Sequence, residues 1–242
     1  MIRGLLGKKI GMTQIFDGEG NIIPVTAIEV GPCYVLQLKE NPLKVVLGFD
    51  AAKESAFNKP RAGVFKKLGM TPLRKVQEVK STDNKDYTVG QEIKTDFFQA
   101  GDFVNVSGTT IGKGFQGGMK RWNWGGGPAA HGSMHHRRVG SIGSSSDPSR
   151  VYRGQHMPGH MGMDKMTTQN LRVMNVDVEN NMILVKGAVP GHKNGYLLVN
   201  KSLKKAFRAI DEKREVVVSK RNPMKQSKAA AKGAAAKPAG KK

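Results

Sequence analysis

The stretch Gly112–Met166 constrains the fold of this chain more than any other part. Its only branched aliphatic residues are Val139, Ile142 and Val151, whereas it holds both tryptophans and five of the six histidines. A segment this poor in aliphatic side chains cannot bury a core of its own, and so long an irregular stretch is uncommon in a compact domain unless it is functional or disordered. Its aromatic, glycine and histidine content is atypical of disorder. We therefore interpret it as a long arm that becomes ordered against a polyanion.

The charge of the chain supports the same interpretation. The formal net charge is +21 and the pI is about 10.2. Within the arm only Asp147 and Asp164 oppose the cations, which are Lys113, Lys120, Arg121, Arg137, Arg138, Arg150, Arg153 and Lys165. An excess this large would repel itself without a counter-polyanion. Phosphate binding is therefore the first expectation.

Length and cysteine content limit the class of protein. The 242 residues allow one or two domains. Cys33 is the only cysteine, so an internal disulfide is impossible and a reducing compartment fits. The N-terminus has no apolar run long enough for a signal peptide, and no run approaches the roughly 18 apolar residues of a membrane helix. We expect a soluble, cytoplasmic protein without a membrane partner.

Many short strand-like runs, separated by turn residues, lie on either side of the arm. They predict an antiparallel barrel rather than a sheet of βαβ units. A slip in the alternation near Val173 predicts a β-bulge. The runs are Leu5–Phe16, Ile22–Val30, Cys33–Leu38, Lys44–Phe49, Leu73–Lys80, Phe103–Val106, Leu171–Glu179, Met182–Lys186 and Tyr196–Asn200.

Two short helices are expected. Pro60–Leu68 has Asn58 as a possible cap and Gly69 as its end, with Val64, Phe65 and Leu68 on one apolar face. The second would start at Ser202 and place Leu203, Ala206, Phe207 and Ile210 on one face. From Ser219 onward the chain is basic without any acidic residue, which fits either a disordered solubilising tail or an element that makes contacts on binding.

The arm opens with Gly112-Lys113-Gly114-Phe115-Gln116-Gly117, which matches G-x-G-x-x-G. We expect no helix after it, because Gly118 and Gly125–Gly127 disfavour one, and no βαβ unit surrounds it. A dinucleotide site is therefore not predicted. Instead, the glycines allow the backbone to approach phosphates closely while Lys113 supplies charge.

Cations and aromatic rings alternate in Lys120-Arg121-Trp122-Asn123-Trp124. Such residues stack on unpaired bases or wedge into folded RNA. The alternative is that one tryptophan packs on the barrel. Further along the arm, four arginines are suited to bidentate binding of phosphates. They are Arg137, Arg138, Arg150 and Arg153.

The histidines of the arm raise the question of a metal. His131 and His135 are four residues apart, as are His156 and His160, but the glycines and proline between them disfavour a helix that would align each pair. Cys33 is distant in sequence and the neighbouring arginines would repel a cation, so no metal or cofactor is predicted. We expect the histidines of the arm to donate hydrogen bonds to phosphates and 2′-hydroxyls. The five histidines concerned are His131, His135, His136, His156 and His160. The serines before Asp147 do not resemble a nucleophile elbow, so no enzyme is predicted.

Several long motifs carry a family resemblance. They are RGLLGKKIGMTQIFDGEGNIIPVTAIEVGPC at the start, GKGFQGGMKRW, HG…HHRRVGSIG, VYRGQHMPGHMG and ILVKGAVPG. Across about Met1–Asn200 they resemble the universal large-subunit ribosomal protein three family of bacterial type. Some bacterial members carry a methylated glutamine where His160 stands, so that modification is not expected here.

The resemblance implies a mostly β fold, with a six-stranded closed antiparallel barrel of the translation-protein type, a small α+β insert and a long irregular extension. The expected parts are the first part of the barrel at 1–50, the insert at 51–90, the middle of the barrel at 91–111, the arm at 112–166, the last part of the barrel at 167–201, and a helix with a basic tail at 202–242.

The function implied by the resemblance is that of a structural constituent of the large ribosomal subunit. Such a protein binds 23S-type rRNA, helps to nucleate early assembly and supports the RNA around the peptidyl transferase centre. The expected partners are rRNA and neighbouring large-subunit proteins, with no small-molecule substrate, in the cytoplasm and bound to the ribosome. Two alternatives stay open, a general nucleic-acid-condensing protein and a zinc- or nucleotide-dependent enzyme.

Overall fold

The structure is a computed structural model that describes residues 2–18, 20–84, 86–205 and 207–209. Met1–Ile210 form one compact unit. Strands dominate this unit, so the expected mostly β fold is confirmed. The basic tail from Ser219 lies outside the described residues. No helix in the described ranges is long and apolar enough to span a membrane.

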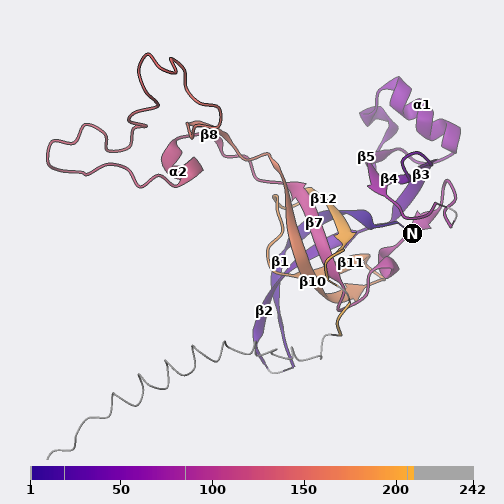
Figure 1. Cartoon of the computed structure of the whole chain (residues 1–242). Coiled ribbons are helices and arrows are strands. Elements are labelled where there is room, and N and C mark those ends of the chain that lie inside the picture. Colours follow the sequence, from indigo (N-terminus) through magenta and orange to yellow (C-terminus); the bar gives the residue numbers. More distant parts are fainter. Residues whose placement is uncertain (1, 19, 85, 206, 210–242) are drawn as a thin grey trace, which may run out of the picture. The chain divides into compact units, whose positions relative to one another are not determined.

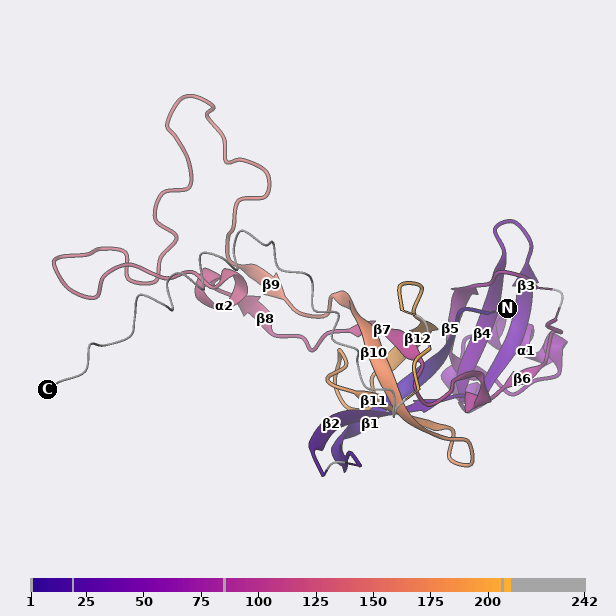
Figure 2. The same ribbon diagram turned by 60° about the horizontal axis from the view of Figure 1, so that its bottom comes forward.

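Six strands pair in a ring in which every neighbour is antiparallel (Figures 1 and 2). Because β1 also pairs with β2, each of these strands has a partner on both sides. Alternate side chains of each strand point to one face, and those on the inner face form the main core, with Leu5, Ile28, Val106 and Val199 buried. In ring order the strands are β1 (Gly4–Phe16), β12 (Tyr196–Lys201), β7 (Phe103–Thr109), β10 (Lys165–Asp177), β11 (Met182–Lys186) and β2 (Ile22–Val30).

The β-bulge expected near Val173 is confirmed. The register between β10 and β11 shifts between Val173 and Asn175. Val173 is completely buried, and Val176 packs against the same core. One extra residue on β10 thus moves the inward positions from odd to even numbers.

A second sheet has the strand order β5 (Leu73–Lys80), β4 (Lys44–Ala51), β3 (Cys33–Lys39) and β6 (Glu92–Ile93). Of two short 3-10 helices, Glu54–Ala56 follows β4 and Thr95–Phe97 follows β6. Residues 1–50 and 91–111 were expected to lie in the barrel, and this is wrong for β3, β4 and β6. Alternation of apolar residues shows that a strand has a buried face, but it does not reveal which strands it pairs with. The insert therefore begins at Cys33.

The expected helix at Pro60–Leu68 is confirmed as α1 (Lys59–Leu68). Gly69 ends it in the left-handed conformation, with φ of 64°, and its N–H donates to the carbonyls of Phe65 and Lys66. Asn58 occupies the N-cap position, but its side chain makes no capping hydrogen bond. Of the expected apolar face, Phe65 is buried, whereas Val64 is 54% exposed.

The helix expected after Ser202 is wrong for residues 203–205 and 207–209, which are not helical, and Ile210 lies outside the described residues. Ser202 Oγ does accept the N–H groups of Lys204 and Lys205, at 3.3 Å each. The chain does not continue as a helix, and further along its carbonyls bind another element. The guanidinium of Arg172 on β10 donates to the carbonyl of Ala209 at 2.6 Å.

Candidate nucleic-acid interface

The arm leaves the six-stranded sheet from β7 and returns into β10, which are neighbouring strands. Thr109 pairs directly with Lys165 across them. One residue further out, the N–H of Thr110 donates to the carbonyl of Asp164 at 2.9 Å, and the N–H of Asp164 donates to Thr110 Oγ1 at 3.1 Å. Both ends of the arm are thus fixed by the same pair of strands.

A short two-stranded ladder forms the first part of the arm (Figure 2). Strand β8 (Gly114–Gln116) pairs with β9 (Gly159–Met161). Between this ladder and the sheet, Gly162 has a φ of 85°, and a Cβ atom there would overlap the carbonyl of Ile111. Only glycine allows the two strands of the arm to approach this closely.

A helix follows the G-x-G-x-x-G motif, so the expectation that glycines would prevent one is wrong. Helix α2 (Gly118–Trp122) is a single short segment that ends at Asn123 in the left-handed conformation, with φ of 58°. Gly118 is buried beneath the Trp124 ring, and any side chain on it would overlap that ring. This glycine is needed for aromatic packing within the arm. The surrounding unit is an antiparallel ladder and not a βαβ unit, which is the context that a dinucleotide site requires.

Two side chains bind the backbone of Met157, and a third stacks on one of them. The guanidinium Nη1 of Arg121 and the indole Nε1 of Trp122 donate to the Met157 carbonyl, at 2.8 and 2.9 Å. His156 stacks on Trp122 with ring centroids 4.0 Å apart and an interplanar angle of 5°. The guanidinium of Arg121 lies 5.1 Å from the same indole centroid. Hydrogen bonds and aromatic stacking therefore join the two strands of the arm where aliphatic side chains are lacking.

Beyond α2, the chain forms irregular loops. The first is closed by the Gly127 N–H, which donates to the His136 carbonyl at 3.0 Å. His136 Nδ1 also lies 2.8 Å from the Pro128 carbonyl. A hollow of about 580 Å³ lies beside this loop, lined in part by Trp124, His135, Arg138 and His156. The loop presents Met134, which is 82% exposed.

The site residues expected from the sequence are almost all at the surface. Arg121 and Trp124 are half-buried. The exposed ones are Lys113, Lys120, Trp122, His131, His135, His136, Arg137, Arg138, Arg150, Arg153, His156, His160 and Lys165. Their role in binding RNA stays a prediction.

The ion pairs among the described residues involve no residue of the arm. They join Lys39 and Lys44 to Glu78, Lys66 to Glu54, and Lys201 to Asp102. The cations of the arm therefore have no carboxylate partner among the described residues, and all except the half-buried Arg121 are exposed. The same residues contain no group of three or more acidic, histidine or cysteine side chains that could hold a metal.

The sequence interpretation missed two aromatic residues of the arm. Phe115 on β8 is 76% exposed, and Tyr152 is 58% exposed with the Arg150 guanidinium 5.7 Å from its ring. Tyr152 is followed directly by Arg153, and Phe115 lies two residues after Lys113. The same alternation of cations and rings could have identified them.

Comparison with known proteins agrees with this arrangement. A family model described as ribosomal protein L3 matches residues 68–178. The large ribosomal subunit protein uL3 of Pelotomaculum thermopropionicum is 51% identical over 209 residues, which cover 84% of this chain and 99% of that protein. The uL3 protein of Syntrophotalea carbinolica is 51% identical over 211 residues, which cover 84% and 100%. That of Brachyspira pilosicoli is 47% identical over 206 residues, which cover 84% and 94%.

These matches define the class as ribosomal proteins, which are structural components rather than enzymes. Within that class, the chain belongs to the uL3 family of large ribosomal subunit proteins, as the sequence motifs implied.

Proposed function

We propose that this chain is a constituent of the large ribosomal subunit that binds 23S-type rRNA directly through the arm at 112–166. In this proposal it helps to nucleate early assembly, and its arm supports the RNA around the peptidyl transferase centre. The observation that carries the proposal is the exposure of the arm cations other than Arg121, none of which has an acidic partner among the described residues.

The construction of the arm supports RNA as the ligand. The ladder, the Trp122–His156 stack and the glycine contacts use backbone and ring atoms, so the cationic side chains other than Arg121 stay available. Each phosphate that a lysine or arginine neutralises releases counterions, which favours binding at low salt. Phe115 and Tyr152 add exposed rings that can stack on unpaired bases.

The six-stranded ring and the residues that follow the arm also have a proposed role. We propose that the ring of six strands is a closed barrel of the translation-protein type that docks on folded rRNA beside neighbouring large-subunit proteins. The arm at 112–166, the final part of the barrel at 167–201 and the basic segment at 202–242 are the proposed functional divisions. The place of action is the ribosome in the cytoplasm.

A competition titration tests this function. Full-length protein is bound to 23S-type rRNA and challenged with duplex DNA of equal phosphate content, in parallel with a variant carrying Trp122→Ala, Arg137→Ala and Arg138→Ala. We expect the wild type to prefer rRNA and the variant to bind it about tenfold or more weakly, since stacked bases contribute roughly 1–3 kcal/mol each. Equal affinity for DNA and rRNA, unaltered in the variant, would instead favour a general condensing protein.

A further inference from the structure

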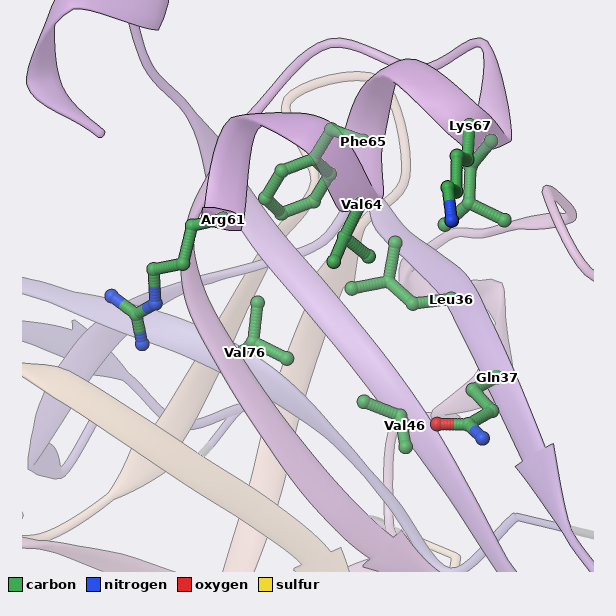
Figure 3. Close-up of a pocket in the computed structure, with 9 residues that line it drawn as sticks. Leu36, Gln37, Val46, Arg61, Val64, Phe65, Lys67 and Val76 are labelled. Carbon is green, nitrogen blue, oxygen red and sulfur yellow. The ribbon is translucent and has the colours of Figure 1, made fainter. Parts of the chain in front are cut away.

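The outer face of the second sheet is only partly covered by α1, and an apolar groove of about 490 Å³ remains between them (Figure 3). Phe65 of the helix fills one end, where it packs with Leu36 and Leu73 in a small core. Figure 3 shows Val46 and Val76 on the sheet and Val64 on the helix around the open part.

The open part of this groove is lined by apolar side chains of a kind that is ordinarily buried. Val64 is 54% exposed and Val76 is 39% exposed, while Val46 is half-buried. Single exposed apolar residues are normal, but a contiguous concave set marks an interaction site more often. Gln37 is the only uncharged polar residue in the lining. The groove therefore offers shape and apolar surface, with few hydrogen-bonding groups.

The charges around the groove are positive. Arg61 and Lys67 line it from the helix, and both are exposed. Further along the same face of the sheet, Val46 pairs with Glu78. That carboxylate is held by Lys39 at 2.5 Å and by Lys44 at 2.8 Å, so its charge is already compensated. An approaching partner thus meets an apolar floor with cations at its border.

We propose that this groove docks an acidic amphipathic segment of another protein, whose apolar side chains fill the groove while its carboxylates meet Arg61 and Lys67. Such a mode, with apolar anchors at helical spacing, is common in helix-in-groove recognition. Nucleic acid fits less well, because the only aromatic ring in the lining, Phe65, is 4% exposed and cannot stack on a base. The basic C-terminal segment of this chain also fits poorly, since it carries no acidic residue from Ser219 onward.

The test uses the full chain and a labelled synthetic helical peptide with leucines at i, i+4 and i+7 and glutamates on both flanks, measured by fluorescence anisotropy. We expect this peptide to bind at least about tenfold more tightly than a version with serines in place of the leucines, because the leucines remove apolar surface from water in the groove and the serines do not. The substitutions Val64→Ser with Val76→Ser, and separately Arg61→Glu with Lys67→Glu, should each weaken binding about tenfold. All four residues are exposed, and circular dichroism confirms that the variants are folded.

Matched controls separate docking from the general attraction of acidic peptides to a basic chain. Val89→Ser removes an exposed valine outside the groove, and Lys59→Glu reverses a charge on α1 that does not line it, so neither should alter peptide binding. Three outcomes would overturn the proposal. They are equal binding of the serine peptide, undiminished binding of the acidic peptide to both pairs of groove variants, and a loss of rRNA affinity in the groove variants as large as that in the arm variants.

Discussion

The imidazole of His156 lies parallel to the indole of Trp122, with ring centroids 4.0 Å apart and an interplanar angle of 5°. Trp122 ends helix α2 on the outgoing segment of the arm and His156 lies on the returning segment, and the Trp122 indole also donates to the carbonyl of Met157. This contact lies at the boundary between the ladder of β8 and β9 and the irregular loops beyond. It gives the base of the arm a defined structure without an aliphatic core.

Replacing Trp122 by Ala and His156 by Ala, singly and together, should reveal this coupling. We expect an interaction free energy of about 0.5–1.5 kcal/mol, as for other stacked ring pairs. It is measured from amide exchange at Lys113, whose N–H donates to the Met161 carbonyl at 2.9 Å and reports closure of the ladder. Trp122→Phe, as an additional single variant, retains a ring but lacks the indole N–H, so it separates stacking from the hydrogen bond to Met157. Strict additivity of the single changes would show that the rings are adjacent without being coupled.

The loops at 125–146 should exchange their amide hydrogens rapidly in free protein and slowly after 23S-type rRNA is added. Ordering each residue costs roughly 1–2 kcal/mol of backbone entropy, and these loops bury little apolar surface to offset it. Hydrogen-exchange mass spectrometry on the full chain measures this. The six-stranded sheet serves as the internal control, since its amides at Val106 and Val199 should be protected in both states. Strong protection of the loops in the free protein would contradict the view that they take their shape from RNA.

Gly118→Ala should disturb the arm although alanine ordinarily favours a helix by about 1 kcal/mol over glycine. The added methyl group would overlap the Trp124 ring, which must move outward, at a cost of roughly 1–3 kcal/mol. A red shift of tryptophan emission and weaker rRNA binding are the expected readouts. Gly117→Ala is the matched control, because Gly117 has a φ of −71° and open space around its Cβ position. Equal effects of the two substitutions would exclude the packing explanation.

Sequence reasoning succeeded where local chemistry decides the structure. Helix α1 could be predicted because Pro60 and Gly69 mark its start and end, and the bulge near Val173 could be predicted from a change in alternation. Pairing was less predictable. Strands β3 and β4 have the same alternating pattern as strands of the ring, and only the contacts of the folded chain assign them to the second sheet.

The arm illustrates both the reach and the limit of such reasoning. Its cations, rings and glycines were identifiable, since they need no tertiary information. Helix α2 was not, because the glycine that disfavours it locally is the one that Trp124 covers. The helix expected after Ser202 fails for the opposite reason, since the capping contacts form but Arg172 binds the following backbone in another conformation.

Cys33 should be nearly inert towards thiol reagents in the folded protein. It is completely buried, its Sγ lies 3.4 Å from the Leu6 carbonyl, and burial raises the pKa of the Cys33 thiol from 9.0 to about 12. Because the thiolate is the reacting species, labelling at pH 8 should require opening of the core between the two sheets and should be at least about a hundredfold slower than in urea.

The same raised pKa predicts a dependence of stability on pH. The unfolded chain loses the thiol proton near pH 9, whereas the folded chain keeps it, so the free energy of unfolding should decrease as the pH rises from about 9 towards 12. Urea unfolding at pH 8 and pH 10.5 measures this, with Cys33→Ala as the control that removes the thiol while lysine and tyrosine titration remains. The wild type should lose more stability than the variant over this interval. An identical loss in both would show that the thiol does not contribute to the alkaline destabilisation.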